Sequence, residues 1–189
     1  MSQPKDRRQA RTRAAILAAA YAQIGETGVH RMSLRAVARA VDYSPAALYE
    51  YFPNKAALLD ELAMRAEGAL AAALAAAPNA PTPLVSLGQA YIAFAHARPI
   101  DFSLLFDHRR SGRRGLSTPA PPQGAYAVLL GRVRSGIIAE TLPADADAET
   151  IAYAIWALSH GLATLQITHL AGFDADFPAA DAAALTALI

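Results

Sequence analysis

The 189-residue chain contains no cysteine, which excludes disulfide bonds, thiolate zinc sites and a cysteine nucleophile. It also lacks the patterns of common enzymes: Ser/His/Asp spacing, paired carboxylates, a glycine-rich phosphate loop and an HExxH motif are all missing. β-Branched residues are sparse and alanine is abundant, a composition that favours helix almost throughout. The sequence therefore predicts an all-α protein that is not an enzyme and that holds no metal or cofactor.

Long apolar runs of the kind that cross membranes or direct secretion are also missing. The N-terminus is charged and has no apolar signal-peptide segment. Residues 151–171 are apolar over long stretches, but Ser159, Gln166 and other polar residues interrupt them, which suits a buried helix better than a membrane span. We expect a cytoplasmic protein without a membrane partner.

What is present is a pair of short helices joined by a tight turn between Ser33 and Lys55. Ser33 suits an N-cap, and apolar residues from Leu34 to Val41 recur at helical spacing on one face. Asp42 breaks that pattern and tolerates the left-handed conformation that a tight corner needs.

The second helix of the pair restarts at Ser44-Pro45, with Ser44 as N-cap and Pro45 at the first helical position, where its missing N–H costs nothing. Leu48 and Phe52 point inward, and Asn54 is placed to cap the next helix. The outer faces are left to Ala46, Ala47, Tyr49 and Tyr51. A short helix of small residues held over a preceding helix is the shape that enters a DNA major groove.

This stretch and its surroundings, about residues 10–62, resemble the N-terminal domain of TetR-family transcriptional regulators. The core of the resemblance is Ser-x-x-x-Leu-Tyr-x-x-Phe-x-x-Lys, with two departures: Asp42 stands where glycine is usual, and Pro45 where lysine is common. The matching residues are Thr12, Arg13, Ile16, Leu17, Ala19, Ala20, Gly28, Ser33, Ala38, Ser44, Leu48, Tyr49, Phe52, Asn54, Lys55, Leu58 and Leu59.

Candidate DNA contacts follow from the resemblance and from the residues themselves. The resemblance implies that Tyr49 and Tyr51 touch DNA, although tyrosines of an amphipathic helix are also common packing residues. Lys55 begins a helix, where backbone N–H groups favour a phosphate. Arg31 and Arg35 flank the start of the helix that begins after Ser33. They either contact the DNA backbone or are ordinary surface residues. The full set of DNA-binding candidates is Arg31, Ser33, Arg35, Ser44, Pro45, Ala46, Ala47, Tyr49, Tyr51 and Lys55.

Charge is distributed unevenly along the chain. Residues 1–65 hold 10 Lys and Arg against 6 Asp and Glu, a net of +4, whereas the remaining residues hold 7 against 10, a net of −3. A basic half that contains the helix–turn–helix is what phosphate binding requires, although solvated arginines alone could produce it.

The expected organisation is a DNA-binding domain over residues 7–54 and an effector-binding and dimerisation domain over residues 55–189. A first helix is expected from about Arg7 or Ala10 to Ile24, after a disordered tail, with Gly25 and Gly28 ending it. A long helix from Lys55 into the alanine-rich stretch ends near Pro78 and leads out of the first domain. Residues 107–123 are rich in Arg, Gly and Pro, which predicts a mobile surface loop.

Aromatic residues among many alanines in the second domain can enclose an apolar cavity. His160 is either a hydrogen-bonded core residue or a polar handle for a ligand. The stretch from Trp156 to Leu162 also resembles the TetR subgroup with a recurring Trp…His-Gly pattern. The predicted ligand pocket is Tyr91, Phe94, Phe102, Phe106, Trp156 and His160.

Two further helices, about 124–140 and 148–170, carry apolar residues on more than one face, so something besides their own domain must cover them. A second copy of the chain, forming an isologous four-helix seam, would do so. The predicted interface is Leu129, Val133, Ile137, Ile155, Leu158, Leu162 and Leu165.

The sequence thus predicts a homodimeric transcriptional regulator that binds a palindromic double-stranded DNA operator. The resemblance implies repression relieved by a small apolar or aromatic effector. Two alternatives stay open: an all-α protein-interaction adaptor with a vestigial helix–turn–helix, and a small helical enzyme that uses His160 as a base. The second alternative requires a carboxylate near His160, which no spacing in the sequence implies.

Overall fold

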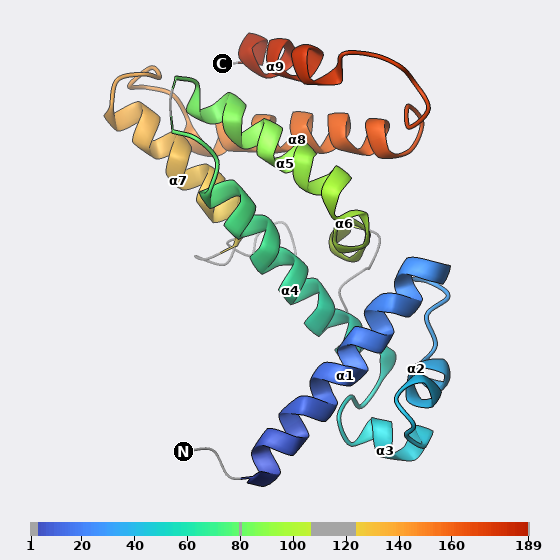
Figure 1. Cartoon of the computed structure of the whole chain (residues 1–189). Helices are drawn as coiled ribbons and strands as arrows, with labels where there is room; N and C mark the ends of the chain where they lie inside the picture. The colour runs from blue at the N-terminus through green and yellow to red at the C-terminus, as the bar shows by residue number, and fades with distance from the viewer. Residues whose placement is uncertain (1–3, 80, 107–123, 189) are drawn as a thin grey trace. The chain divides into compact units, whose positions relative to one another are not determined.

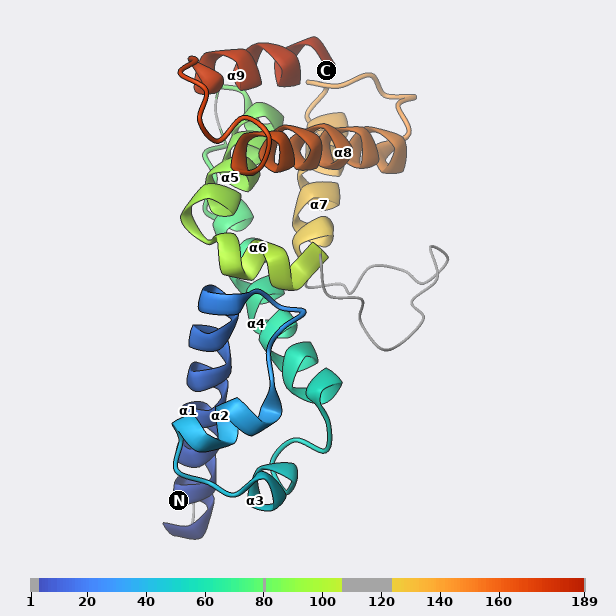
Figure 2. The same cartoon turned by 90° about the vertical axis from the view of Figure 1, so that its right-hand side faces the viewer.

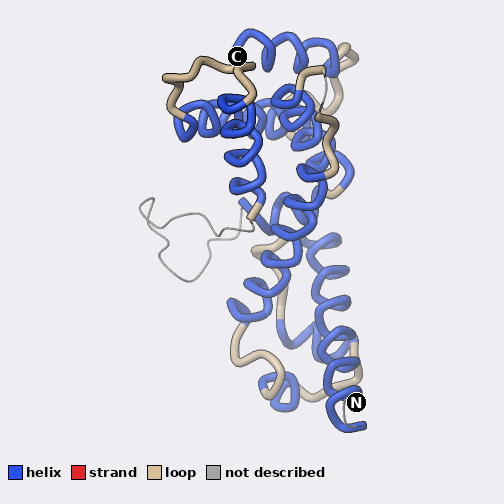
Figure 3. Tube along the Cα trace, turned by 90° about the vertical axis from the view of Figure 1, so that its left-hand side faces the viewer, coloured by secondary structure: helices blue, strands red, loops and turns tan. Residues whose placement is uncertain are grey.

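The computed structural model describes residues 4–79, 81–106 and 124–188, and throughout these it contains helices and loops but no strand (Figure 3). The predicted all-α fold class is confirmed. In chain order the helices are α1 (Pro4–Thr27), α2 (Leu34–Ala40), α3 (Pro45–Tyr49), α4 (Lys55–Ala75), α5 (Pro83–Ala97), α6 (Pro99–Phe106), α7 (Ala125–Ile138), α8 (Ala148–Ile167) and α9 (Phe177–Leu188). The segment 107–123, which we expected to form a mobile loop, lies outside the described residues.

The described chain forms two compact units. The first comprises the described parts of Met1–Ala66 and Ile100–Arg113, and the second those of Glu67–Pro99 and Arg114–Ile189. Helix α4 therefore contributes its first half to one unit and its second half to the other. Helix α6 belongs to the first unit although it follows α5 of the second unit directly in the chain.

The first unit is built on α1, with α2 packed against α1 and α3 against α2 (Figure 1). Its core side chains come from all five helices of the unit, because each presents an apolar face at helical spacing. The largest fully buried members include Ile16 and Leu17 of α1, Leu48 of α3, Leu58 of α4 and Leu104 of α6.

Helix α1 is longer than predicted at both ends. It begins at Pro4 rather than near Arg7 or Ala10, and it continues through Gly25, which we expected to end it. The helix stops just before Gly28, which has a φ of 81° and whose N–H donates to the Ile24 carbonyl at 2.8 Å. A residue without a side chain adopts this left-handed conformation at no steric cost.

Gly25 has a packing role instead. A Cβ atom at this position would lie 2.9 Å from Cδ1 of Ile100 on α6, closer than side chains approach one another. The glycine therefore leaves space for the end of the Ile100 side chain, a long-range contact that helix-ending signals in the sequence do not indicate.

The second unit is a helical bundle in which α5 packs on α8, α7 packs on both, and α9 lies against α5 and α8 (Figures 1 and 2). Gly88 of α5 permits the close approach of α9, since a Cβ there would lie 2.6 Å from the side chain of Leu185. Leu185 itself is fully buried.

A chain of polar side chains also links these three helices. Nε2 of His96 on α5 lies 2.9 Å from Oε1 of Gln166 on α8, and Nε2 of Gln166 donates to both carboxylate oxygens of Asp181 on α9, at 2.8 and 3.0 Å. Gln166 and Asp181 are both buried. Buried polar groups need such partners, so this chain of bonds fixes the position of α9.

Candidate DNA-binding surface and effector cavity

The corner between α2 and α3 has the geometry of a helix–turn–helix. Asp42 adopts a φ of 58°, as expected for a residue that tolerates the left-handed region, and the next N–H, from Tyr43, donates to the Ala38 carbonyl at 2.9 Å. Oγ of Ser44 then accepts a hydrogen bond from the Ala47 N–H at 3.1 Å, and Pro45 takes the first helical position. The cap at Ser44 and the position of Pro45 were both predicted from the sequence.

Helix α3 presents small side chains and one tyrosine to solvent. Ala46 is exposed, Ala47 is half-buried, and Tyr49 is 50 % exposed. Leu48 is fully buried beneath them and anchors the helix on the core. Because the alanine side chains of α3 project little, a large partner can approach the backbone of this helix closely.

Tyr51 has a different environment from Tyr49. Its ring is half-buried and lies edge-on to the ring of Tyr43, with 6.2 Å between centroids. The hydroxyl of Tyr43 in turn lies 3.3 Å from Oγ1 of Thr12 on α1. Tyr51 thus contributes to packing between the turn region and α1, which was one of its two expected roles.

Arg13 of α1 holds the end of α3 in place, a role that sequence reasoning did not assign. Its Nη1 donates to the Tyr51 carbonyl at 2.8 Å, its guanidinium lies over the Phe52 ring at 4.2 Å, and it forms an ion pair with Glu61 of α4. The signal in the sequence that could have pointed to this role is that Arg13 is one of the residues that resemble the TetR family. A cation over an aromatic face and a charged pair both stabilise this junction.

Lys55 begins α4 and reaches the loop between α1 and α2. Its Nζ donates to the His30 carbonyl at 2.9 Å, and partial burial lowers the pKa of its ammonium group. Asn54 caps α4 as predicted, accepting from the Ala57 N–H at 2.8 Å. Because Arg31 follows His30 directly, two candidate phosphate contacts are brought to the same loop.

The remaining candidates lie at the start of α2. Arg31 is exposed, with Nε donating to the Thr27 carbonyl at 2.8 Å, and Arg35 is exposed on α2. Ser33 occupies the N-cap position of α2 with an extended backbone, but its side chain makes no capping bond. Its N–H instead donates to Oε1 of Gln23 at 3.0 Å, so a side chain of α1 holds the start of α2.

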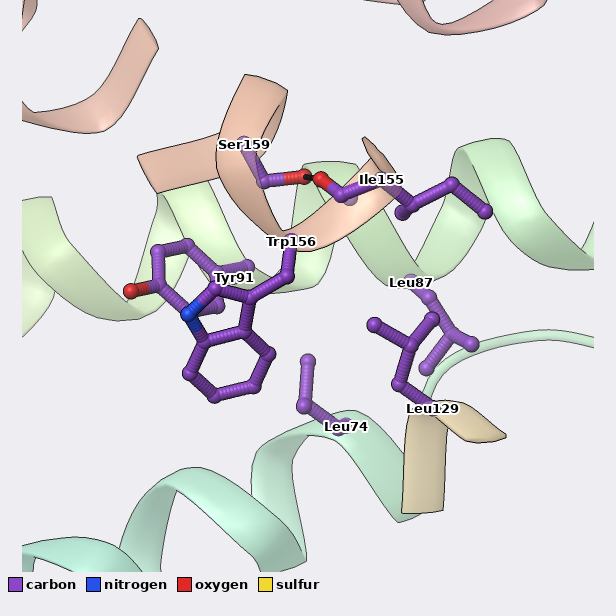
Figure 4. Close-up of a pocket in the computed structure, with 8 residues that line it drawn as sticks. Leu74, Leu87, Tyr91, Leu129, Ile155, Trp156 and Ser159 are labelled. Carbon is purple, nitrogen blue, oxygen red and sulfur yellow. Dashed lines mark hydrogen bonds between the residues drawn. The ribbon is translucent and has the colours of Figure 1, made fainter. Parts of the chain in front are cut away.

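The second unit contains a small cavity of about 10 Å³ (Figure 4). Its walls are mainly apolar and come from α4, α5, α7 and α8. The lining residues are Leu74, Leu87, Gly88, Tyr91, Leu129, Ile155, Trp156 and Ser159. A volume of this size holds about one water molecule.

Tyr91 and Trp156 form the aromatic side of the cavity. Their rings meet edge-to-face at 5.1 Å, and Tyr126 of α7 meets Trp156 from another direction at 5.8 Å. The Tyr91 hydroxyl lies 3.0 Å from Nδ1 of His160. The pKa of the Tyr91 phenol is raised, mainly by burial and to a smaller extent by the negative charge of Glu67, so the hydroxyl stays neutral. The partner of Nδ1 of His160 is thus a neutral phenol.

Four of the predicted pocket residues do not line this cavity: Phe94, Phe102, Phe106 and His160. His160 is connected to the cavity only through the hydroxyl of the wall residue Tyr91. Phe94 is buried in α5 but is not part of the cavity wall. Phe102 and Phe106 lie on α6, with their ring centroids 4.8 Å apart and their planes tilted by 51°, and α6 packs in the first unit. Periodicity places these rings on apolar faces, but it does not tell which unit each face joins.

The predicted dimer residues also divide into two groups. Leu129, Val133 and Ile155 are buried within the second unit, where a second copy cannot reach them. Ile137, Leu158 and Leu162 are half-buried, and Leu165 is 47 % exposed.

The outward face of α8 carries a stripe of small and apolar residues at four-residue spacing, here called the α8 stripe: Tyr153, Ala157, Gly161 and Leu165. All four are exposed, and Tyr153 reaches 69 %. A Cβ at Gly161 would meet no atom within 4 Å. The stripe is thus an uncharged helix surface open to close approach by another helix.

Within the described ranges, no group of three or more His, Cys, Asp or Glu side chains is placed to hold a metal ion. No helix of that part of the chain is long and apolar enough to cross a membrane.

Comparison with known proteins adds family information to this geometry. Residues 16–62 match the family described as bacterial regulatory proteins, tetR family, and residues 84–189 match the tetracyclin repressor-like C-terminal domain. No curated protein matches the sequence.

Several solved structures share the fold. A protein of unknown function from Rhodococcus sp. RHA1 is 28 % identical with a TM-score of 0.77, covering 94 % of this chain and 93 % of its own. Salmonella enterica GusR is 22 % identical with a TM-score of 0.71, covering 100 % and 97 %. A TetR variant from Acinetobacter baumannii AYE, solved in complex with minocycline, is 20 % identical with a TM-score of 0.62, covering 92 % and 91 %.

The two matched segments contain the two candidate sites of the structure. The first contains the Ser44-capped helix α3, and the second contains most of the cavity wall around Tyr91 and Trp156. This chain belongs to the TetR family of bacterial regulatory proteins, with a DNA-binding helix–turn–helix unit and a tetracyclin repressor-like C-terminal domain.

Proposed function

We propose that the protein is a homodimeric repressor that binds a palindromic operator through α3 and releases it when a small apolar or aromatic effector enters the second unit. The observation that carries the proposal is that α4 is one helix with two roles. Leu58 and Leu62 of α4 belong to the core that supports α3, while Leu74 of the same helix lines the cavity.

On the DNA side, α3 enters the major groove and its small residues approach base edges. Ala46 and Ala47 allow contact with a thymine methyl group, and Tyr49 and Lys55 contact phosphates. Few long polar side chains are available at this surface, so DNA shape contributes much of the specificity. The two recognition helices of a dimer sit one DNA turn apart, roughly 34–36 Å, or a modestly larger repeat.

On the effector side, the cavity of about 10 Å³ must widen before it can hold a ligand, since ligand pockets occupy roughly 300–1,000 Å³. Leucine and isoleucine side chains suit an apolar body, and the bonded pair of Tyr91 and His160 offers a polar handle at one side. The lining comes from both α4 and α5, and these are the helices whose ends connect to the first unit, α4 directly and α5 through α6. Effector binding therefore favours one position of α4 and changes the spacing of the recognition helices.

The α8 stripe is the surface that we assign to the dimer. Small residues let two helices approach closely, and burial of Tyr153 and Leu165 against a second copy removes apolar surface from water. Ile137, Leu158 and Leu162 are available at the edge of such a seam.

The finer subgroup assignment, to regulators with a Trp…His-Gly pattern, rests on Trp156, His160 and Gly161. As a reader of bacterial DNA, the protein acts in the cytoplasm.

Selection of bound fragments from genomic DNA tests the proposal directly. We expect recovery of palindromic sites, and loss of their binding on addition of one member of a panel of aromatic and aliphatic compounds. Recovery of fragments with no common sequence would contradict the proposal and favour the adaptor alternative.

Lys55→Ala is expected to weaken binding to all DNA sequences about equally. Loss of one phosphate contact per subunit lowers the slope of log K against log salt by roughly 0.9 per subunit. The slope is measured by anisotropy titrations of a labelled operator at several salt concentrations, with Lys55→Arg as the charge-preserving control. An unchanged slope in Lys55→Ala would mean that this side chain only anchors the His30 loop.

Trp156 is the only tryptophan, so its fluorescence is expected to report effector binding. Effector entry separates or repacks the rings of Tyr91 and Tyr126 around the indole, which changes its emission. Tyr91→Phe removes the hydroxyl partner of His160 and is expected to weaken binding of an effector that uses this polar handle by roughly fivefold to tenfold. Tyr126→Phe, which keeps its ring beside the indole, serves as the control. An effector that releases DNA without changing the emission would exclude Trp156 from the site.

A further inference from the structure

A groove of about 960 Å³ opens on the second unit, separate from the cavity around Trp156. It is lined by the end of α4, the start of α5, one face of α7, the turn after α7 and the end of α9, and the described linings of the two sites have no residue in common. Its volume falls within the range of small-molecule sites, roughly 300–1,000 Å³.

The charge of the groove has one sign. Among the described residues that line it, Arg132 of α7 is the only charged one. Its Nη1 donates to the Pro78 carbonyl at 3.2 Å and its Nη2 to the Ala77 carbonyl at 3.4 Å, which orients the guanidinium at the end of α4. A guanidinium has five N–H donors, so donors remain for an anionic ligand.

The rest of the described wall is uncharged and contains no aromatic side chain; beside small and aliphatic residues it includes the polar side chains of Asn79, Thr82, Ser135, Thr141 and Thr186. Leu84, Val85, Val128 and Leu142 supply apolar surface, and Gly131 on α7 leaves space, since a Cβ there would meet no atom within 4 Å. This surface fits a flexible aliphatic chain and lacks the flat partners that would favour a stacked ring.

We propose that this groove is a second ligand site that binds an amphipathic monocarboxylate, with the carboxylate on Arg132 and the aliphatic chain along α7. Because Arg132 is the only charged residue among the described wall residues, the groove favours a ligand with a single negative charge. The aliphatic side chains of the wall favour an aliphatic chain as the rest of that ligand. The arginine-rich segment 107–123 of the chain itself is a poor occupant, because its charge has the same sign as Arg132.

The full-length protein is titrated with decanoate, with decanol as the neutral probe of the same chain length. Binding is followed by calorimetry, by the backbone amide resonances of Gly131 and Gly136, and by Trp156 fluorescence, which reports the other cavity. Decanoate is expected to shift the two glycine resonances and to leave the Trp156 emission unchanged. We expect decanol to bind roughly tenfold more weakly, because it lacks the charge-assisted hydrogen bond.

Two variants test whether decanoate binds in this groove, and each has a matched control. Gly131→Leu fills the groove and Arg132→Gln removes its charge, so each is expected to weaken decanoate binding by roughly tenfold or more. Gly68→Leu adds the same side chain in open space on α4, and Arg134→Gln removes an exposed arginine that pairs with Glu149 outside the groove. Both controls are expected to bind as the wild type does.

Several results would overturn the proposal: no decanoate binding, equal binding of decanol, or wild-type affinity in Arg132→Gln. A fluorescence change at Trp156 without a shift at Gly131 would place the ligand in the other cavity and also overturn it. A change of oligomeric state in a folded Gly131→Leu variant would make the groove a contact between copies instead. Should Gly131→Leu lose its helical circular dichroism, Arg132→Gln and the resonance shifts decide the outcome.

Discussion

A chain carrying Ala46→Glu is expected to lose operator affinity by on the order of 100-fold or more while it keeps its fold and its oligomeric state. Ala46 is exposed on α3, so a longer side chain disturbs no core contact. In the DNA complex the new carboxylate would face phosphates and base edges in a confined groove, where like charges repel strongly. Anisotropy titration of a labelled operator measures the loss, and circular dichroism with sedimentation tests the fold and assembly.

Ala22→Glu is the matched control for this experiment. Ala22 is also an exposed alanine of a helix in the same unit, but it lies on α1 rather than on α3. It introduces the same charge, so general repulsion between the protein and DNA is common to both variants. Wild-type affinity in Ala46→Glu, or an equal loss in Ala22→Glu, would show that α3 is not the recognition helix.

Leu165→Glu is expected to convert the protein to a monomer and to reduce affinity for a palindromic operator by roughly 100-fold or more. Leu165 is 47 % exposed on the α8 stripe, so the substitution leaves the unit's own core intact. Two carboxylates brought together in an apolar seam would each lose hydration without a partner. Once the subunits separate, the second half-site no longer adds to binding, and a palindrome binds no tighter than a single half-site.

Met64→Glu tests whether the effect is specific to the seam. Met64 is a large apolar residue that is 57 % exposed on α4, so the change in charge and exposed apolar area is similar. We expect a dimer with normal operator binding. Sedimentation that finds Leu165→Glu still dimeric at micromolar concentration would remove the α8 stripe from the interface.

The helix–turn–helix could be predicted well because its signals are local. Ser44 and Asn54 cap helices through bonds to residues three positions away, and Asp42 takes the left-handed conformation that its own side chain tolerates. Each of these features depends on a few neighbouring residues. The sequence could therefore specify them without knowledge of the rest of the fold.

Positions governed by distant contacts were predicted less well. The stop signal assumed at Gly25 is a space for Ile100, which lies on a helix that joins the first unit from far along the chain. Phe102 and Phe106 lie on that same helix, so they are absent from the cavity wall in which their aromatic character led us to predict them. Leu129, Val133 and Ile155 were predicted at a dimer seam, but their own unit buries them.

Sequence alone therefore determined the all-α class, the Ser44 and Asn54 caps and the Asp42 corner, because helix propensity and capping act over a few residues. It also determined the family, through the pattern of residues that the helix–turn–helix carries. Tertiary structure decided which apolar face each helix buries, where a cavity closes around Tyr91 and Trp156, and that Arg132 lines a separate groove. The physical reason is that an apolar stripe specifies only that it must be covered. Which helix covers it depends on how residues far apart in the sequence pack together.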